Sequence, residues 1–527
     1  MLRGRGARAE EELDLDFTEL VDLAAEGVGG TVLYATDDFF ASKDNLLKPK
    51  EAVFIDGKYT DNGKWMDGWE SRRRREHAFA SAPASDHDFA IVRLGLPGIV
   101  RGFVVDTAHF TGNYPAACSI EGASISGYPS LAELLSADVA WTEIAPRTDL
   151  RGGHKNRIEV DSAERYTHLR FHIYPDGGVA RLRVHGEVIP DARWLGKREL
   201  PMLSDLAAAE NGGVVVTCND MFFGARHNLV GPGRAPHMGD GWETKRGRRP
   251  GPDWVVVRLA AEGQIVRAII DTQHFKGNAP DACALCVATS RDGDPPGADD
   301  SLWTSLLPST RLLPHTTHLF EDELLAHAPA THVRMRIWPD GGVSRLRLMG
   351  LPSARGREES GMRRVRAMPH AELEAALRSC CGSSAWVRKM VALRPLSDLA
   401  SLQAAAAQTW DALAEADWDE AFRAHPRIGE TKAAAAQSAT AKAWSAGEQA
   451  RVSEADPKVT AALAEANRAY EAKFGRIYIV CATGKTADEM LAIAEARLGN
   501  DAKTELAVAA GEQKKITALR LDKLVLR

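Results

Sequence analysis

The sequence predicts two tandem all-β domains followed by an all-α domain. Three motifs occur twice in the same order, about 170 residues apart, which is the size of an ordinary domain. In both copies, short runs of β-branched and aromatic residues are separated by glycine and proline, as in a β-sandwich. After about residue 365 no motif repeats, and apolar residues recur with a helical period of about 3.6.

The repeat sets the expected domain bounds. We expect the first β domain at residues 15–190, the second at 198–351 and the helical domain at 367–527. Each is long enough to bury a core of its own. Residues 352–366, rich in arginine, glycine and serine, are expected to form a polar linker.

Composition excludes several classes of partner. The net charge of −6 offers no basic footprint for nucleic acid. No stretch has the roughly 18 to 20 apolar residues of a membrane helix, and the N-terminus lacks the apolar segment of a signal peptide. Seven scattered cysteines, an odd number, suit a reducing compartment. We therefore expect a cytoplasmic protein with neither nucleic acid nor membrane as a partner.

The predicted strands fall at matching places in the two copies. They are residues 30–34, 89–94 and 169–174 in the first copy, and residues 214–216, 254–259 and 333–338 in the second. A Pro-Asp-Gly-Gly turn follows the last strand of each set, so we expect a hairpin that closes each domain. Cys283 and Cys286 form a lone Cys-x-x-Cys, and because a zinc site needs four ligands we expect buried strand residues.

The polar residues that both copies share are the functional candidates, because they lie in glycine-broken loops, where function concentrates. They are Asp67, Glu70, His109 and Asn113 in the first copy, and Asp240, Glu243, His274 and Asn278 in the second. A structural alternative exists for each, since Asp and Asn beside glycine also close ordinary turns. At Asp106 and Asp271, which stand at strand ends, bonding to backbone donors is the favoured interpretation.

Long stretches of both copies resemble the allantoicase family. They are Asp37-Asp38-Phe39-Phe40-Ala41, Lys64 to Glu70 with Arg72 and Arg73, Val105 to Asn113, and their second-copy forms. The resemblance covers most of residues 15–350. It implies a pair of jelly-roll domains of the galactose-binding-like kind that hydrolyse allantoate to ureidoglycolate and urea.

Allantoate chemistry calls for groups that these loops can supply. Its carboxylate is best held by an arginine fork, and an acid must protonate the nitrogen that departs with urea. The candidate clamps are Arg72, Arg73, Arg246 and Arg248, and the candidate proton carriers are Glu70, Glu243, His109 and His274. The sequence does not say which copy reacts. A divalent metal is a further candidate cofactor, although no ligand spacing specifies it.

The tail has the pattern of a helical domain. Behind an expected N-cap at Ser397, apolar residues from Leu402 to Leu413 fall on one helical face. Near the end, the apolar run Ile477 to Ala482 predicts either a buried helix start or an extended segment, which periodicity does not distinguish.

Several tail motifs are similar to the OHCU decarboxylase family over residues 367–527. They are Ala421 to Gly429, Ser445 to Gln449, Tyr470 to Gly475 and Lys515 to Leu521. The resemblance implies conversion of 2-oxo-4-hydroxy-4-carboxy-5-ureidoimidazoline to (S)-allantoin, a reaction for which no cofactor is expected.

The same residues predict a site. Pro426 disfavours helix at His425, so a helix begun near Asp417 should end there and leave the imidazole open to a ligand as acid or base. Ser445, Glu448 and Gln449 stand at i, i+3 and i+4, hence on one helical face. The resemblance makes His425 and Glu448 catalytic. It gives as substrate contacts Pro426, Ser445, Gln449, Ile479, Val480, Cys481, Ala482, Thr483 and Arg520.

Two hypotheses follow for the whole chain. The first is a bifunctional enzyme of purine catabolism with small ureido substrates. The second is a single-activity OHCU decarboxylase that carries the jelly rolls as a binding or assembly module, because such folds host many functions. In either case we expect a homo-oligomer.

Overall fold

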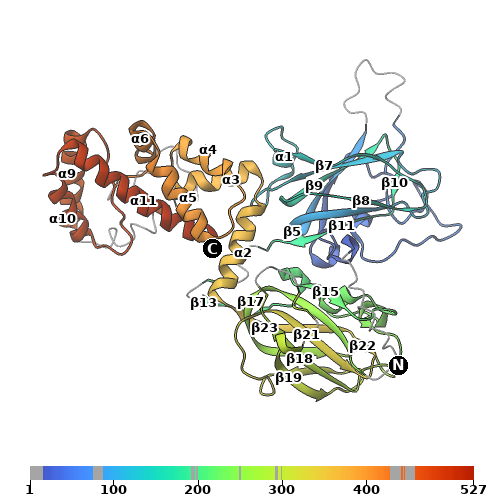
Figure 1. Ribbon diagram of the computed structural model, residues 1–527. Coiled ribbons are helices and arrows are strands. Elements are labelled where there is room, and N and C mark those ends of the chain that lie inside the picture. Colours follow the sequence, from blue (N-terminus) through green and yellow to red (C-terminus); the bar gives the residue numbers. More distant parts are fainter. Residues whose placement is uncertain are drawn as a thin grey trace, which may run out of the picture. The chain divides into compact units, whose positions relative to one another are not determined.

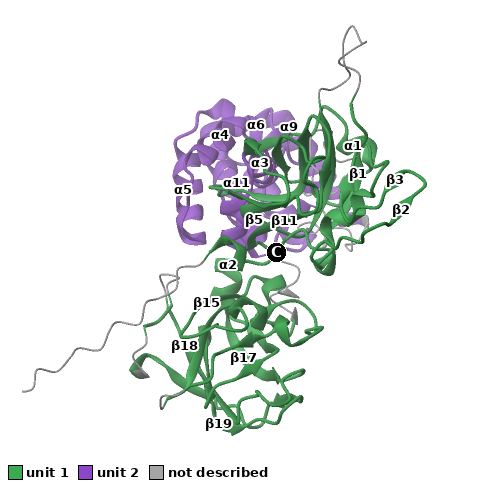
Figure 2. Ribbon diagram, turned by 90° about the vertical axis from the view of Figure 1, so that its right-hand side faces the viewer, with its two compact units in different colours: residues 1–360 green, residues 361–527 purple. Residues whose placement is uncertain are grey.

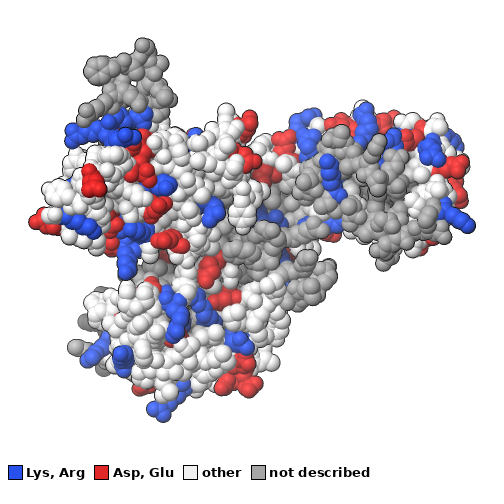
Figure 3. Space-filling view, turned by 180° about the vertical axis from the view of Figure 1, so that it is seen from behind, with Lys and Arg blue, Asp and Glu red and all other residues white. Residues whose placement is uncertain are grey.

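The chain forms two compact units, residues 1–360 and 361–527 (Figures 1 and 2). The computed structural model describes residues 16–74, 87–190, 196–197, 200–247, 251–290, 295–297, 300–427, 441–442, 444–445 and 457–526. Among these residues, no helix is long and apolar enough to cross a membrane. Acidic and basic side chains are interspersed on the face drawn in Figure 3.

In the first repeat, one long strand joins the two layers of the β-sandwich. This strand, β5 (Asp88–Asp106), pairs with β1 (Thr31–Ala35) and β9 (Arg165–Tyr174) along its first half. Its second half pairs with β8 (Lys155–Glu159) and β11 (Arg181–Val188). The remaining strands are β2 (Tyr59–Thr60), β3 (Gly63–Lys64), β4 (Trp69–Glu70), β6 (Ala117–Ala123), β7 (Thr142–Asp149) and β10 (Gly178–Val179), with a short helix α1 (Leu131–Leu134).

The second repeat has the same plan around β17 (Asp253–Asp271). Its other strands are β14 (Ser204–Asp205), β15 (Val214–Cys218), β16 (Trp242–Glu243), β18 (Ala282–Ala288), β19 (Thr304–Arg311), β20 (Thr317–Phe320), β21 (Ala330–Trp338), β22 (Gly342–Val343) and β23 (Arg345–Pro352). Two short strands, β12 (Gly196–Lys197) and β13 (Leu200–Pro201), lie between the repeats in sequence. All six strands predicted from the sequence are confirmed, and Cys283 and Cys286 lie on β18 as free thiols.

The predicted closing hairpin is wrong. β9 and β11 pair with different halves of β5, and the Pro-Asp-Gly-Gly turn leads into β10, which pairs with β4. The second repeat does the same with β22 and β16. The glycine has a packing reason, because a Cβ on Gly178 would lie 2.1 Å from the Phe110 ring. The turn therefore brings three repeated motifs together instead of closing a two-stranded ribbon.

The C-terminal unit is helical, which confirms the predicted class of two all-β jelly-roll domains followed by an all-α domain. Its helices are α3 (His370–Cys380), α4 (Ser384–Ala392), α5 (Leu399–Asp411), α6 (Glu415–Arg423), α9 (Pro457–Phe474), α10 (Ala487–Arg497) and α11 (Ala502–Leu526). The N-cap of α5 is Asp398, not Ser397, because the Asp398 carboxylate accepts a hydrogen bond from Ser401 N at 2.7 Å.

The residues expected to form a polar linker are instead mostly helical. Helix α2 (Ala354–Ala367) follows directly on β23. Its sequence is polar but contains no proline, and arginine and glutamate are good helix formers. In its second half, Met362 and Val365 are buried in the core of the helical unit, and Gly361 lies so close to Val525 that a Cβ would not fit. The polar composition predicted a linker, but the second half of the segment is buried in the helical domain and belongs to it.

Candidate active sites

His425 lies just beyond the end of a helix, as the following proline predicts. Helix α6 ends at Arg423, and His425 N donates its hydrogen bond to Phe422 O at 3.0 Å. The side chain is half-buried and lines a pocket with Pro426 and Ser445. The pocket therefore has an imidazole at a helix terminus as one of its walls.

The opposite wall is the apolar run near the end of the chain, which is extended rather than helical. Ile479, Val480, Ala482 and Thr483 line the same pocket. After α9 ends at Phe474, the next helix begins only at Ala487, so this segment is not helical. Of the two alternatives that the sequence left open, the extended segment is the one observed. The structure thus brings together most of the substrate contacts that the sequence predicts.

Two of the predicted contacts are not among the pocket-lining residues. Arg520 is almost fully buried, and its guanidinium donates to Ser445 Oγ at 2.9 Å, so it contacts the pocket through that serine. Cys481 turns its backbone toward two charged side chains, described next. Glu448 and Gln449 lie outside the described residues.

Charged residues that the sequence analysis missed fix the extended segment. Arg497 donates to Ile479 O at 2.7 Å, Glu512 accepts from Cys481 N at 2.8 Å, and Lys485 donates to Cys481 O at 2.6 Å. Although burial acts to raise the pKa of Glu512, hydrogen bonds from Lys515 and Cys481 N hold it below its usual value. The sequence feature that could have identified these residues is a charged side chain on an otherwise apolar helix face.

Behind this segment lies a fully buried ion pair. Arg497 Nε donates to Glu505 Oε1 at 2.8 Å, and Tyr470 also donates to Glu505. A buried pair is expensive to desolvate, so its geometry must be well satisfied, and Asn500 supplies a further hydrogen bond to Glu505 at 2.7 Å. The wall of the pocket is therefore held from behind by a rigid polar group.

In the β unit, the Asp of each Asp-Gly-Trp-Glu motif is paired with an arginine. Asp67 Oδ2 accepts from Arg181 Nη2 at 2.8 Å, and Asp240 Oδ2 accepts from Arg345 Nη2 at 2.6 Å. Burial acts to raise the pKa of Asp67, but the hydrogen bonds from Arg181 and Val53 N hold it below its usual value. Both arginines follow the Pro-Asp-Gly-Gly turn. Their recurrence in the repeat was the sequence signal that could have singled them out.

The Glu of the same motif bonds to the Asn of the second motif. Asn113 Nδ2 donates to Glu70 Oε1 at 2.7 Å, and Asn278 Nδ2 donates to Glu243 Oε1 at 2.6 Å. Burial raises the pKa of Glu70, and the hydrogen bond from Asn113 opposes that shift only in part. A raised pKa favours the protonated form of a carboxyl group, which is the form that a proton donor needs.

The repeated histidines adopt a rare backbone conformation. His109 and His274 have φ values of 70° and 75°, in the left-handed region. Each Nε2 lies near a backbone carbonyl, Ala52 O at 3.1 Å and Ala235 O at 2.9 Å. Because a carbonyl only accepts, each Nε2 carries the proton. Asp106 and Asp271 accept from backbone N–H groups two residues on, which confirms their predicted backbone role.

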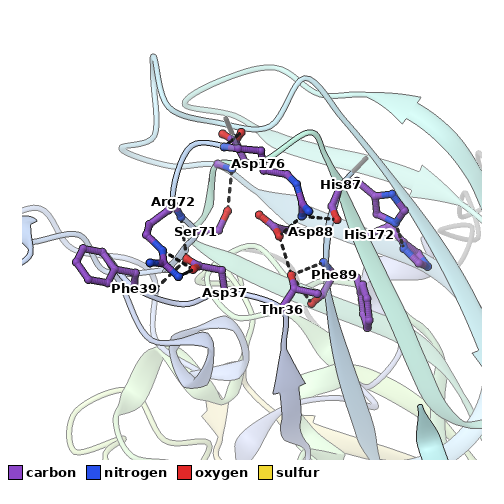
Figure 4. A network of polar contacts seen from close by, with 12 residues as sticks. Thr36, Asp37, Phe39, Ser71, Arg72, His87, Asp88, Phe89, His172 and Asp176 are labelled. Carbon is purple, nitrogen blue, oxygen red and sulfur yellow. Dashed lines mark hydrogen bonds and ion pairs between the residues drawn. The ribbon is translucent and has the colours of Figure 1, made fainter. Parts of the chain in front are cut away.

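The predicted arginine clamps are exposed. Arg72 pairs with Asp37 at 2.6 Å and lies over the Phe39 ring (Figure 4). Arg73 and Arg246 are exposed, and Arg248 lies outside the described residues. Because Asp37 already neutralises Arg72, that arginine is a weaker clamp than the sequence alone suggests.

A histidine pair occurs in the first repeat alone. His172 Nε2 donates to Glu121 at 2.9 Å, so its Nδ1 accepts from His87 Nε2 at 2.7 Å (Figure 4). The corresponding residues of the second repeat are Arg336, Cys286 and Pro252. Nothing in the motif pattern pointed to this pair, because the repeat does not contain it twice.

A metal site was also considered for the repeats. The described His, Cys, Asp and Glu side chains form no group of three or more that could hold a metal ion. Those residues therefore do not fit the divalent metal named as a candidate cofactor.

Comparison with protein families divides the chain as the fold does. The allantoicase repeat matches residues 21–189 and 204–353, and the OHCU decarboxylase family matches residues 366–522.

Individual relatives agree with these matches. A probable allantoicase of Burkholderia mallei is 48% identical over 337 residues, 63% of this chain and 94% of the relative. One of Streptomyces avermitilis is 47% identical over 340 residues, 64% of this chain and 87% of the relative. Among solved structures, Saccharomyces cerevisiae allantoicase has 32% identity and a TM-score of 0.49, covering 63% of this chain and 93% of that one. An OHCU decarboxylase crystallised with (S)-allantoin has 35% identity and a TM-score of 0.26, covering 29% of this chain and 99% of that one.

Proposed function

The chain belongs to the allantoicase family and carries an OHCU decarboxylase domain behind its two repeats, and from this we propose a bifunctional enzyme of purine catabolism. The N-terminal unit hydrolyses allantoate to ureidoglycolate and urea. The C-terminal unit decarboxylates 2-oxo-4-hydroxy-4-carboxy-5-ureidoimidazoline to (S)-allantoin. We assign the domains to residues 15–190, 198–351 and 367–527, with α2 in place of a linker.

For the decarboxylase, the carrying observation is the pocket that His425, Ser445 and the 479–483 segment share. As carbon dioxide leaves, the electron pair of the broken C–C bond forms a double bond to the neighbouring ureido-bearing ring carbon, and the hydroxyl-bearing carbon then becomes the ring carbonyl. The imidazole of His425 delivers a proton to the ureido-bearing carbon, which becomes the stereocentre of allantoin. Backbone groups of the extended segment, with Thr483, Glu448 and Gln449, hold the ureido and ring amides, and Arg520 and Ser445 hold the carboxylate side.

Replacing His425 tests this assignment. His425→Asn should lower kcat for decarboxylation by on the order of 100-fold or more, because a positioned acid or base contributes about that much. Ser445→Ala should mainly raise KM. The assignment fails if His425→Asn turns over like the wild type, with circular dichroism showing both proteins folded.

For the hydrolase, the carrying observation is that each copy bonds its repeated motif residues in the same pairs. The reaction adds the water oxygen to the central carbon and breaks that carbon's bond to one ureido nitrogen. The water proton must reach that nitrogen so that urea leaves neutral, which requires an acid. The described residues offer no metal site, so no step is assigned to a metal.

The hydrolase proposal is tested with the full-length chain. Allantoate should yield urea at a rate well above the uncatalysed blank, and EDTA treatment should leave the rate unchanged. No urea, with or without added divalent metal, would support the alternative of a binding or assembly module attached to a decarboxylase. A homo-oligomer and a cytoplasmic location stay predictions, and sedimentation of the pure protein tests the first.

The two reactions are not consecutive. Decarboxylation yields allantoin, whereas hydrolysis consumes allantoate, so a ring-opening step by another enzyme must lie between them. We therefore assign no direct channelling between the sites.

A further inference from the structure

A cavity of the β unit lies between its two repeats. It has a volume of about 650 Å³ and is lined from the first repeat by the segment Thr18–Asp22 and by β11, and from the second by the segment His227–Pro232. Cavities of roughly 300 to 1,000 Å³ commonly bind small molecules, and they often form where domains meet. The space is large enough for a small carboxylic acid.

A buried ion pair joins the repeats beside this cavity. Glu19 of the first repeat accepts hydrogen bonds from Arg226 of the second, at 2.7 Å to Nε and 3.2 Å to Nη2. The Arg226 side chain is 0% exposed. Removing one partner of such a pair would strand a buried charge, so the contact fixes the two repeats against each other.

The arginine of each repeated Asp–Arg pair lines this cavity. Arg181 of the first repeat and Arg345 of the second contribute to the lining together with Asp106 and Asp240, whereas Asp67, the partner of Arg181, does not. The Glu–Asn pairs and the repeated histidines do not. Because Arg181 and Arg345 also bond several backbone carbonyls, they brace the cavity walls.

The remaining polar lining comes from positions that are not equivalent in the two repeats. Arg183 and His185 line the cavity, but their counterparts on β23 are Arg347 and Met349, which do not. Arg347 donates instead to the carbonyls of Val230, Gly231 and Gly233. The two copies have thus diverged where they face each other, which is expected if together they form one asymmetric site.

Three of these groups have hydrogen-bonding capacity for a ligand. His227 lines the cavity with its ring, whose Nδ1 is buried and has no hydrogen-bond partner among the described residues. His185 donates Nδ1–H to Leu20 O at 2.8 Å, which leaves Nε2 as an acceptor in the neutral ring. Arg183 donates one hydrogen bond, to Pro49 O at 3.1 Å, and its contact with Asp22 is 3.7 Å long, too long for a hydrogen bond.

The charges that line the cavity are balanced. The cations are Lys155, Arg157, Arg181, Arg183 and Arg345, and the acids are Glu19, Asp22, Glu51, Asp106 and Asp240. A phosphate or polyanion would find no excess positive charge here. A small molecule with one carboxylate and several amide groups matches the mixture of donors and acceptors.

We infer that allantoate binds in this inter-repeat cavity, one molecule per chain, with Arg183 on its carboxylate and His227 beside the departing ureido nitrogen. The inference rests on the proposed hydrolase function and locates its site. The water oxygen bonds to the central carbon as the C–N bond breaks. The imidazole of His227 passes a proton to the leaving nitrogen and regains one from the water.

Kinetics of urea release by full-length variants test this placement. Arg183→Gln should raise KM for allantoate by about tenfold or more, because it removes a charge-assisted hydrogen bond. His227→Gln should lower kcat by about 100-fold with a smaller change in KM. The matched controls are Arg93→Gln and His318→Gln, which lie outside the cavity lining and should behave as the wild type. Thermal unfolding identifies any variant that is merely destabilised.

The outcomes separate the inference from the proposed function. No urea from the wild type would overturn the hydrolase itself. If the wild type released urea and both Arg183→Gln and His227→Gln had the kcat and KM of the control variants, the placement of allantoate in the cavity would be overturned. The placement of allantoate in the cavity would also be wrong if Glu70→Gln alone abolished hydrolysis, because Glu70 lies within the first repeat and outside the cavity lining. As a second measurement, Val214→Trp, at a half-buried lining position, should narrow the cavity and raise KM without changing any charge.

Discussion

At the scale of single residues, the same side-chain pair forms in each repeat: Asn113 donates to Glu70, and Asn278 donates to Glu243. Because both motifs occur twice, the sequence predicts these four residues as candidates. It did not predict Arg181, whose partner Asp67 is 114 residues away. Such a contact depends on which strands lie side by side, and residue type alone does not give that. His227 was missed for the opposite reason, because it occurs in one copy only.

A buried histidine at the same place in each repeat should make the β unit acid-sensitive. His168 and His332 are each 1% exposed, and burial lowers the pKa of both to about 4. The unfolded chain takes up these protons near pH 6.5, so between pH 6.5 and 4 the unfolded state binds more protons. Stability present above pH 6.5 is therefore lost as pH falls toward 4, by up to about 3 kcal/mol per histidine.

Urea unfolding of the full-length protein at several pH values between 7.5 and 4.5 measures this effect. The double variant His168→Gln and His332→Gln should lose clearly less stability across that range than the wild type. His154→Gln, at an exposed histidine, should keep the wild-type slope. An unchanged slope in the double variant would contradict the explanation.

At the scale of elements, the strands were predictable and their connections were not. Apolar residues at alternating positions mark β9 and β17 plainly, because these side chains fill the core of each sandwich. The turn after β9 has the residues of a hairpin, yet Phe110 packs where a hairpin partner would start, and the chain crosses to the other layer. Helix α2 was missed because its polar composition hides its buried positions, among them Met362 and Val365.

The extended segment that walls the decarboxylase pocket should be sensitive to its backbone contacts. Glu512→Ala removes the acceptor for Cys481 N, so the segment should shift and kcat/KM for decarboxylation should fall by about tenfold. Glu512→Gln keeps an acceptor at the same place and should retain activity within about threefold of the wild type. The measurement is the rate of substrate loss at subsaturating concentration.

Lys515→Ala is the control for this pair, because it removes the ion pair with Glu512 but leaves the bond to Cys481 N. It should behave like Glu512→Gln. If all three variants lost activity equally, the ion pair between Glu512 and Lys515 would matter and the hydrogen bond to Cys481 N would not.

At the scale of the whole molecule, the boundary between the units decides which fragments fold. The family matches end at residue 353 and resume at 366, which suggests cutting the tail free near 366. Burial argues for an earlier cut, because Met362 and Val365 are 1% and 6% exposed and belong to the helical core. Gly361 contacts Val525 of α11, so α2 also holds the C-terminal helix.

A fragment of residues 354–527 should therefore be more stable than one of residues 368–527. Burying a Met and a Val side chain contributes roughly 1.5–3 kcal/mol each, so the shorter fragment should lose about 3 kcal/mol or more. It should also expose the apolar core residues against which Met362 and Val365 pack, and tend to aggregate. Urea unfolding followed by circular dichroism at 222 nm compares the two, with decarboxylase activity per folded molecule as the second readout. Equal midpoints would mean that α2 belongs to the β unit alone, and that the polar stretch is a linker after all.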